Sequence, residues 1–522
     1  MKKRQIYKAG NKTITKEINY IPFRFILALL ITILEVFAII GIVVALCYFV
    51  PYFYLLAFLT QVFCVMKIVT SNDNPEYKLP WLLLVLIVPV AGFMLYFIFY
   101  SRKLKTKYVK RLKGLYSITY PEQDDYNFKN LKTQSNSAFN QAKLLTNLSY
   151  SHLFTNTTQK YFSSGKEMWK SMLTDLKNAK NFIYLEYFII EEGEFWNSIL
   201  EILKEKTHSG LDVKVVFDDV GCMTTLPANH SKKLKKFGIK AVPFSRLKGQ
   251  ADNEFNNRSH RKIMVIDGKI AYTGGVNIAD EYVNLKSRFG HWKDVGIRLE
   301  GEAVYEFTKL FLIDFGLSVK EKFDIPSQDI LFPKCDVKEN GFLIPFGDGP
   351  SPIYKCRTSQ RLIMDMLANA KKYAYIMTPY LVIDNDLCLA IESASLKGVD
   401  VRIIVPHVPD KKIVFELTKT FYERLMKTGV KIYEYTPGFI HAKAYLVDGE
   451  TAIVGTMNLD YRSLVHHFEN GVWLYKTDCI SDIEKDFFET FEKCVLITEG
   501  QTKKTLLQKI ARSIIRVFAP LL

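Results

Sequence analysis

One short sequence pattern occurs twice in this chain and limits what the chain can fold into. The first copy, HRKIMVIDGKIAYTGGVN, runs from His260 to Asn277, and the second, HAKAYLVDGETAIVGTMN, runs from His441 to Asn458. His, Lys, Asp, Gly and Asn occupy the same relative positions in both copies, with apolar residues between them. Such agreement indicates an internal duplication, so we expect two similar structural units.

Each copy predicts a β-hairpin. In the first copy, the apolar run Ile263 to Ile266 is typical of a short strand, and Asp267-Gly268 favours a tight turn before a second short strand. The His and the Lys of each copy lie two positions apart, so on an extended strand their side chains point to the same face. Each unit therefore offers an imidazole beside an ammonium group.

These side chains suit a phosphodiester substrate. The ammonium groups of Lys262 and Lys443 would bind phosphoryl oxygens, and the amides of Asn277 and Asn458 would donate further hydrogen bonds. A neutral imidazole can attack phosphorus, whereas an imidazolium can protonate a leaving alkoxide. One histidine cannot do both at once, but two histidines from facing repeats can. A structural role, the ordinary expectation for a single histidine, fits the duplicated set poorly.

The pattern H-x-K-x4-D-x6-G-[GST]-x-N, present twice, resembles the phospholipase D superfamily, and within it the bacterial cardiolipin synthases. The segment PWLLLVLIVPVAGFMLYFIFYSRKLK (Pro80 to Lys105) is similar to the amino-terminal membrane segment of that family. AKNFIYLEYFII (Ala179 to Ile190) and TPYLVIDNDLCLAIESASLKGVDVRIIVP (Thr378 to Pro406) resemble parts of the two repeats. The resemblance covers the chain from about residue 75 to its end.

The resemblance implies that one motif histidine becomes a covalent phosphohistidine and the other acts first as acid and then as base. We expect His260 to be the nucleophile and His441 the general acid/base, although the near-symmetry of the motifs leaves the reverse assignment open. Asp267 and Asp448 are the motif aspartates of the family. Their position at a hairpin turn suggests that they brace the site.

Two carboxylates follow the motifs, Asp294 in HWKDVGI and Glu469 in HFENGVW. Each could hydrogen-bond a motif histidine and fix its tautomer, and a solvated acid is the alternative. The motifs also depart from many relatives, which have Ser where this chain has Gly275 and Thr456. Threonine keeps the hydroxyl, whereas Gly275 leaves its half without one.

Three apolar runs precede the repeats. Phe25 to Val50 and Leu79 to Tyr100 are long enough to span a bilayer, and Tyr52 to Val69 could span it or dip into it. The first run is too long for a cleavable signal peptide, and more hydrophobic sequence follows it. Buried core helices are the alternative interpretation of these runs.

Basic residues flank both ends of this apolar region, so both ends should be cytoplasmic. Two spans satisfy that condition and three do not; either one run is re-entrant or one basic cluster is overruled. We expect a multi-pass protein of the bacterial plasma membrane with a cytoplasmic catalytic part. The basic residues before and after the region are Lys2, Lys3, Arg4, Lys8, Lys12, Lys16, Arg102, Lys103, Lys105, Lys107, Lys110, Arg111 and Lys113.

The formal net charge of +16 suits either nucleic acid or anionic lipid as a partner. The final segment, TKKTLLQKIARSIIRVFAPLL, predicts an amphipathic helix on an anionic surface, or else a basic helix packed on the domain. Scattered cysteines without a CxxC pair are typical of a reducing compartment. No zinc pattern is present in the sequence, so we expect no metal.

The repeats predict an α/β fold, with two phospholipase D-like sandwiches that share one active site. AKNFIYLEYF corresponds to AKKYAYIMTPY, GLDVKVVFD to GVDVRIIVP, and FGIKAVPF to GVKIYEYT, and the strands alternate with helices. A polar, aperiodic stretch from Asn127 to Ser151 should link the membrane part to the first repeat. We expect a membrane anchor, a first repeat, a second repeat and a basic tail over residues 1–125, 126–325, 326–500 and 501–522.

The expected function is that of a cardiolipin synthase. One phosphatidylglycerol would lose glycerol and form a phosphatidyl-histidine, which the hydroxyl of a second phosphatidylglycerol would attack. The exchange trades one phosphodiester for another, so no cofactor is needed. A hydrolytic phospholipase D, or another phosphatidyltransferase, is the alternative. The membrane segment disfavours a nucleic-acid phosphodiesterase, and two complete motifs argue against a non-catalytic lipid-binding protein.

Overall fold

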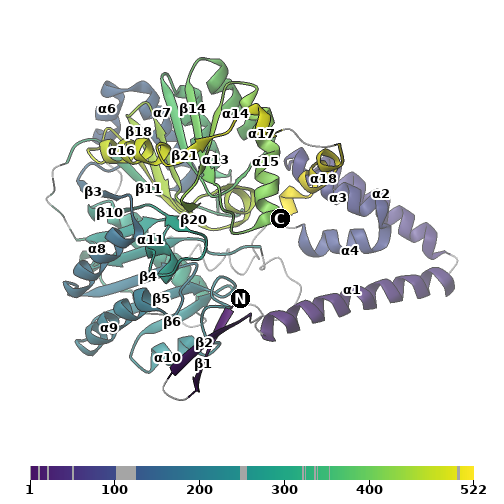
Figure 1. Ribbon diagram of the computed structural model, residues 1–522, viewed down its shortest axis with the longest axis horizontal. Coiled ribbons are helices and arrows are strands. Elements are labelled where there is room, and N and C mark those ends of the chain that lie inside the picture. The colour runs from purple at the N-terminus through teal and green to yellow at the C-terminus, as the bar shows by residue number, and fades with distance from the viewer. Residues whose placement is uncertain are drawn as a thin grey trace.

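The computed structural model has amino-terminal helices and two α/β halves (Figure 1). It describes residues 2–9, 12–19, 23–49, 52–100, 125–246, 256–319, 323, 325–333, 335, 337, 339–351, 353–354, 356–502 and 506–521. The basic cluster between residues 102 and 113 lies outside the described residues. A short antiparallel hairpin of β1 (Lys2–Ala9) and β2 (Lys12–Asn19) precedes the first helix.

The first half is a seven-stranded mixed sheet. Its strands, in spatial order, are β3 (Thr157–Phe162), β10 (Gly296–Gly301), β8 (Ile270–Gly274), β7 (Lys262–Ile266), β4 (Phe182–Tyr187), β5 (Asp212–Asp218) and β6 (Lys240–Phe244). Its helices are α8 (Gly165–Lys177), α9 (Glu194–His208), α10 (His230–Lys235) and α11 (Val304–Ser318). Strands β4, β5 and β6, at one side of the sheet, are parallel, as the alternation of strands and helices predicts.

The second half repeats this order strand for strand. Its sheet contains β11 (Phe342–Asp348), β20 (Glu469–Tyr475), β18 (Thr451–Gly455), β17 (Ala444–Val447), β12 (Tyr373–Met377), β14 (Asp400–Pro406) and β15 (Lys431–Tyr435), with β21 (Cys494–Leu496) added at the edge. Its main helices are α13 (Thr358–Asn369), α14 (Asn385–Leu396), α15 (Lys412–Met426) and α16 (Ile480–Phe491). The duplicated α/β fold predicted from the two motifs is therefore confirmed.

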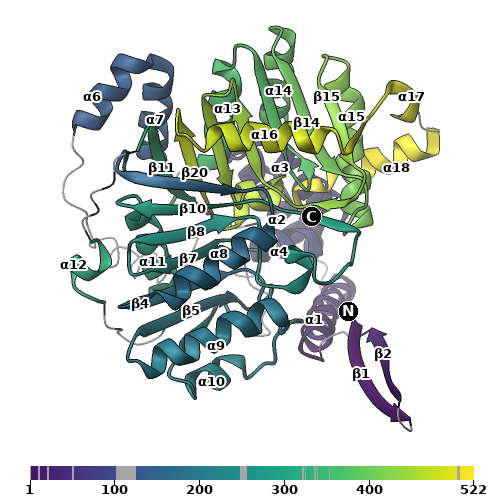
Figure 2. The same ribbon diagram turned by 60° about the vertical axis from the view of Figure 1, so that its left-hand side comes forward.

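The side chains of each strand divide between two apolar cores because successive residues point to opposite faces of a sheet. On β4, Phe182 and Tyr184 join a core shared by both halves, whereas Ile183 and Leu185 join the core under α8 and α9. β12 divides its residues in the same way between the shared core and the core under α13, α14 and α15. The inner faces of the two sheets thus meet across α11, which is buried over almost its whole length (Figure 2).

Two short parallel ladders join the halves near the motifs. β9 (His291–Lys293) of the first half pairs with β16 (Gly438–Ile440) of the second, and Ser259 forms a parallel bridge with Phe468. In each case, a segment that enters a motif in one half runs beside a segment that precedes a carboxylate of the other half. β8 also lies against β18 and β20. The motif hairpins therefore meet at the junction of the halves.

The stretch between residues 127 and 151 is not an irregular linker. It forms α6 (Asp125–Gln134) and α7 (Asn136–Ser149), and α7 starts with a Ser135 side-chain cap. Phe128, Leu131 and Leu145 are buried in the core of the second half rather than the first. Its apolar residues are sparse, so their helical spacing is inconspicuous in the sequence, but a few of them suffice to dock two short helices.

The apolar region forms four helices beside the two halves (Figure 1). They are α1 (Phe23–Phe49), α2 (Phe53–Thr70), α3 (Pro75–Ile87) and α4 (Pro89–Phe99). Among the described residues, α2 is the one helix both long and apolar enough to cross a membrane by composition. Large apolar side chains along α1 and α2 are exposed, which indicates membrane association.

The run from Leu79 to Tyr100 is not one spanning helix, contrary to expectation. It breaks at Val88, because Pro89 has no amide hydrogen to donate and disfavours helical backbone in the residue before it. α3 and α4 then fold back on each other, and Gly92 allows the close contact: a Cβ there would lie 2.5 Å from the Leu84 carbonyl oxygen. With 13 and 11 residues, neither helix alone is long enough to span a bilayer.

The basic tail forms α18 (Leu506–Val517), which combines the two interpretations of the sequence. One face packs on α15, where Ile515 contacts the second-half core and the Arg516 guanidinium lies 4.7 Å from the centre of the Phe421 ring. Ile510 and Ile514 on the other face are 50% and 57% exposed. The helix also lies beside α3 (Figure 1).

The motif aspartates join each hairpin to the central strand of its own sheet. The carboxylate of Asp267 accepts hydrogen bonds from the backbone amides of residues 180, 181 and 182 at 2.8, 2.7 and 2.9 Å. Asp448 accepts the equivalent bonds from residues 371, 372 and 373 at the same three distances. Both aspartates have positive φ, 54° and 55°, which reverses the chain at the turn.

We predict that Asp267→Ala lowers the free energy of unfolding by about 2–4 kcal/mol, because three largely buried amides lose their acceptor. Asp448→Ala should cost less, about 1–2 kcal/mol, because two of its three bonds are exposed. Denaturant unfolding of the purified protein in detergent measures both, with the exposed Glu201→Ala as control. Equal stability of Asp267→Ala and the control would contradict the bracing role.

Candidate active site

Each motif histidine lies at the end of a segment that pairs with the other half. The backbone amide of His260 donates to the Phe468 carbonyl at 2.9 Å, and the amide of His441 donates to the Lys293 carbonyl at 2.7 Å. Phe468 and Lys293 each precede one of the two downstream carboxylates. Backbone pairing therefore sets each histidine beside a carboxylate of the opposite half.

The histidine–carboxylate pairs cross between the halves. Glu469 of the second half accepts from Nδ1 of His260 at 2.9 Å, and Asp294 of the first half accepts from Nδ1 of His441 at 2.7 Å. All four side chains are buried. Each carboxylate holds its imidazole through Nδ1, so Nε2 of both rings is left to react. The structure thus places both carboxylates on the motif histidines and makes the pairing reciprocal.

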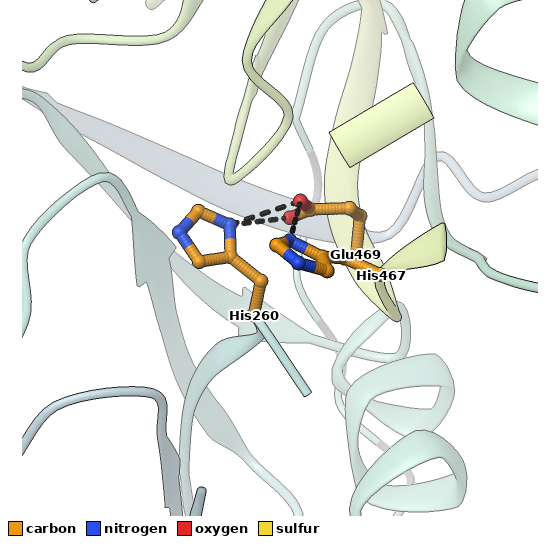
Figure 3. Close-up of side chains that lie close together, drawn as sticks. All are labelled: His260, His467 and Glu469. Atoms are coloured by element: carbon orange, nitrogen blue, oxygen red, sulfur yellow. Dashed lines mark hydrogen bonds and ion pairs between the residues drawn. The ribbon is translucent and has the colours of Figure 1, made fainter. Parts of the chain in front are cut away.

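The His260 side of the site has additional polar groups. Figure 3 shows that the rings of His260 and His467 both face the Glu469 carboxylate. Their centres are 5.5 Å apart. Ser463 and Thr456 also donate their hydroxyls to the Glu469 carboxylate. Within the described residues, His467 Nδ1 has no hydrogen-bond partner, and it lies 3.9 Å from Glu469 Oε1. The threonine hydroxyl of the second motif therefore serves Glu469.

Gly275 occupies the position in the first motif that Thr456 occupies in the second. Glycine is needed there because of limited space. A Cβ on Gly275 would lie 1.9 Å from Oδ1 of Asp294, and 2.9 Å from the His441 carbonyl oxygen. Asp294 is held by His441 and by the amide of Val295 at 2.9 Å, so it cannot move aside without loss of a hydrogen bond. The missing side chain makes room for the carboxylate that orients His441.

Both motif lysines are buried beside the histidines. The ammonium of Lys262 donates to the His260 carbonyl at 2.7 Å, and Nζ of Lys443 lies 2.8 Å from Nδ1 of His441. Burial lowers the pKa of Lys262 to about 7 and that of Lys443 to about 8, although Glu469 and Asp294 oppose both shifts. An anionic ligand in this site would raise the pKa values of both lysines back toward their ordinary range, so the site favours an anion.

Burial also keeps both motif histidines neutral near pH 7. It lowers the pKa of His441 to about 4, with Lys443 adding to the effect and Asp294 opposing it. The pKa of His260 is lowered well below its usual value by burial and by Lys262. Burial raises the pKa of Glu469 to about 8, against the ammonium of Lys262. When Nδ1–H of the neutral His260 ring donates to Glu469, Nε2 keeps its lone pair.

The motif asparagines are tied into the protein. Asn277 accepts from the amide of Ile189 at 3.0 Å and donates to the Tyr282 hydroxyl at 2.8 Å. Asn458 donates to Asp460 at 3.1 Å, and its Oδ1 atom has no partner among the residues that the structure describes. Each amide keeps a second N–H, so these contacts leave room for a bond to a phosphoryl oxygen.

His260, His467 and Glu469 could in principle share a metal ion, because their ligand atoms lie within 4.8 Å of one another. His260 Nδ1 is already bonded to Glu469, however, and the ammonium of Lys262 is close enough to influence both groups. A positive potential of this kind opposes a cation. We therefore assign the cluster to hydrogen bonding rather than to a metal.

The structure adds residues that the sequence interpretation missed. Asp218 accepts from Arg258 at 3.0 Å and from the amide of Ser259 at 3.1 Å, and so fixes the approach to His260. Arg261 donates to the Glu469 carbonyl at 3.1 Å. His467 was signalled only by its place in HHFEN, two residues before Glu469. The others carried no local signal, because their partners lie far away in sequence.

We predict that Gly275→Ala lowers the turnover of this site about tenfold or more, because the new methyl group displaces Asp294 from His441. Assays of the purified variant measure the loss, and thermal unfolding checks that the protein still folds. Thr456→Ser, which keeps the hydroxyl to Glu469, is the matched control and should stay near wild type. A Gly275→Ala variant as active as Thr456→Ser would contradict the packing argument.

Comparisons with known proteins agree on one family. Residues 172–294 and 363–491 match the family described as "Cardiolipin synthase, PLD-like domain", and residues 59–99 match "Phospholipase_D-nuclease N-terminal". The two matches to the first family contain both histidine–lysine motifs, and the third covers most of α2 and all of α3 and α4.

Relatives match over nearly the whole chain. An uncharacterized protein of Streptococcus mutans is 39% identical, over 88% of this chain and 99% of its own. The cardiolipin synthase of Halalkalibacterium halodurans is 34% identical, over 90% of this chain and 94% of its own. Cardiolipin synthase 2 of Bacillus anthracis is 33% identical, over 87% and 88%.

Among solved structures, the phosphatidylserine synthase of Haemophilus influenzae has the same fold, with a TM-score of 0.55 and 18% identity. The likeness covers 74% of this chain and 98% of that one. Together, the duplicated fold, the paired motifs and the extent of the sequence matches place the chain in the cardiolipin synthase family of phospholipase D-like proteins.

Proposed function

We propose that the protein is a cardiolipin synthase that transfers a phosphatidyl group from one phosphatidylglycerol to another. The observation that carries the proposal is the single buried site in which His260 and His441 are each held by a carboxylate of the opposite half, with two lysines between. Membership of the family and the apolar helices beside the site support a lipid substrate.

In the first step, Nε2 of His260 attacks the phosphorus of the donor lipid. The bond between phosphorus and the glycerol oxygen breaks, and His441 gives the leaving alkoxide a proton, so glycerol departs and a phosphatidyl-histidine remains. Lys262 and Lys443, helped by Asn277 and Asn458, would stabilise the charge that develops on the phosphoryl oxygens.

In the second step, a hydroxyl of another phosphatidylglycerol attacks the phosphatidyl-histidine. His441, now neutral, takes the hydroxyl proton, the phosphorus–nitrogen bond breaks, and cardiolipin leaves. The reaction exchanges one phosphodiester for another and returns every proton, so it requires no cofactor.

The charge of the substrate sets the protonation of the site. His441 is neutral in the free protein, since its pKa is about 4, and it cannot act as an acid in that state. A bound phosphodiester brings a negative charge beside it, which favours the imidazolium. Asp294 stabilises the same form. Only a loaded site would therefore hold the proton that the leaving group needs.

The assignment of His260 as nucleophile is supported by the groups around Glu469. The hydroxyls of Thr456 and Ser463 fix the Glu469 carboxylate. The His260 ring that this carboxylate holds is therefore firmly oriented for attack. Asp294 accepts fewer bonds, and the ring that it holds must change protonation twice per turnover.

The break in the third apolar run suggests a topology. With α1 and α2 as spans, and α3 and α4 as a hairpin that enters and leaves on one side, both basic clusters would lie on the cytoplasmic side. The catalytic halves would then be cytoplasmic, with the exposed isoleucines of α18 against the bilayer surface.

We predict that His260→Ala and His441→Ala each abolish synthesis, because the two rings act as a unit. Rapid quench of the wild-type reaction should trap a phosphatidyl group on the peptide that contains His260, which peptide mapping by mass spectrometry detects. A label on His441 would reverse the assignment. Activity of either variant near wild type would contradict the shared site.

The acceptor distinguishes synthase from hydrolase. We expect full-length protein in phosphatidylglycerol bilayers to form cardiolipin and glycerol, and added glycerol to drive the reaction backwards through the same intermediate. Lipid product analysis by mass spectrometry measures both. Phosphatidic acid alone, at every lipid density, would replace the proposal with a hydrolytic phospholipase D, and His441→Ala controls for background hydrolysis.

A further inference from the structure

A cavity of about 1030 Å³ lies between the apolar helices and the second half. One wall comes from the ends of α2 and α4 and the loop that begins α3, and the other comes mainly from α13 and the segment before it. Neither the motif histidines nor the motif lysines line it. The cavity is therefore separate from the catalytic centre, and it sits where the apolar helices end.

Two cations of this cavity form no ion pair with a described carboxylate, although the Lys67 ammonium lies 4.7 Å from the centre of the Phe97 ring. Lys67 lies in the last turn of α2, and Arg361 lies on α13; both are exposed, and within the described part of the chain no carboxylate pairs with either. Arg357, a neighbour in the same wall, differs because Asp384 binds it at 2.8 Å. The carboxylates of Asp73 and Asp386 also line the cavity. Neither forms an ion pair with Lys67 or Arg361, so these two positive charges suit an anion such as a phosphodiester.

The rest of the lining suits the remainder of a glycerophospholipid. The Tyr96, Phe97 and Tyr100 side chains come from the end of α4, where aromatic rings favour the boundary between lipid and water. Asp386 and Ser351 offer oxygens that can accept hydrogen bonds from hydroxyl groups. The exposed apolar side chains of α2, such as Met66, continue from this point along the path that acyl chains would follow.

The cavity is close to the His260 side of the catalytic centre. Leu464 and Val465 line it, and they belong to the short helical turn η3 (Arg462–His466), which leads directly to His467 and Glu469. On another wall, the hydroxyl of Tyr354 accepts a hydrogen bond from Arg261 at 3.0 Å, and Arg261 also holds the Glu469 backbone. A molecule in the cavity is thus one layer of residues from the group that orients His260.

We propose that this cavity holds the head group of the acceptor, an anionic glycerophospholipid with free hydroxyls, while the donor occupies the site between His260 and His441. The inference rests on the proposed synthase function. Lys67 and Arg361 bind its phosphate, and the hydroxyl end lies toward Leu464 and Val465, the side of the cavity nearest His260. A second lipid held beside the phosphatidyl-histidine gains effective concentration over water, which synthesis rather than hydrolysis requires.

Two reactions of the same protein separate the acceptor from the donor. Exchange of labelled glycerol into phosphatidylglycerol needs only a donor lipid, whereas cardiolipin formation needs both lipids. In vesicles of phosphatidylglycerol diluted with phosphatidylcholine, Lys67→Ala/Arg361→Ala should keep glycerol exchange within about twofold of wild type. Its cardiolipin formation should fall about tenfold or more, with a raised KM for phosphatidylglycerol, because two charge-assisted contacts are lost.

Matched variants control for charge and folding. Lys67→Arg/Arg361→Lys keeps both charges and should restore most of the synthesis, whereas Lys371→Ala removes an exposed cation outside the cavity and should change neither reaction. Thermal unfolding checks each protein, and the single variants Lys67→Gln and Arg361→Gln replace the double variant if it is unstable.

The outcomes distinguish the inference from the function on which it rests. Wild-type protein that forms cardiolipin, with a double variant that forms it equally well, overturns the acceptor site alone. Equal loss of exchange and synthesis also overturns it, since the cavity would then serve the donor. Wild-type protein that exchanges glycerol without forming cardiolipin overturns the proposed function, and the acceptor site with it.

Discussion

The reciprocal hydrogen bonds between the halves are the interaction on which the site depends. Glu469 holds His260 and Asp294 holds His441, so each imidazole is bonded to a carboxylate of the opposite half. The segments before these residues pair across the same junction, which fixes the carboxylates within reach of the rings. Neither repeat alone would hold its own imidazole in this way, and the duplication is therefore a requirement of the chemistry as well as a feature of the fold.

The burial of this junction explains its electrostatics. Two ammonium groups and two imidazoles lie together out of water, and burial favours the neutral form of each. The free site therefore holds fewer positive charges than its residues would carry in water. In the proposed mechanism, a bound phosphodiester would restore the missing charge, and its binding would be coupled to protonation of the proposed general acid His441. Water would screen this coupling, and the closed junction excludes it.

The apolar helices contact the second half through polar side chains at the start of α3. α3 contacts the second half through Asn74, which donates to Asp384 at 3.1 Å, and through Glu76, which accepts from the amide of Asn385 at 3.3 Å. Polar contacts therefore hold the apolar helices against the second half. The break at Pro89 gives the anchor a short hairpin whose two ends stay close to the second half.

Local sequence patterns predicted much of the fold and of the candidate site. The motif spacing predicted the duplication, the hairpins, and the histidine, lysine, aspartate and asparagine of each motif. The strand patterns predicted the two matching sheets, because strand alternation and turn chemistry act over a few residues. Sequence also suggested that Asp294 and Glu469 would orient histidines, but it could not say which ones. The helices between residues 125 and 149 were missed, because their weak apolar faces gain stability only from the second half.

Only the tertiary structure decided which histidine each carboxylate holds and how much space Gly275 leaves for Asp294. It also decided the shifted pKa values and the cavity at the ends of α2 and α4. Each of these depends on residues from separate elements that meet at a packed interface, and most lie more than a hundred positions apart. Sequence by itself determined which chemical groups the chain carries and which elements hold them. The packing of two sheets across one junction determined which groups touch, because contact distance and exclusion of water are properties of the folded interface.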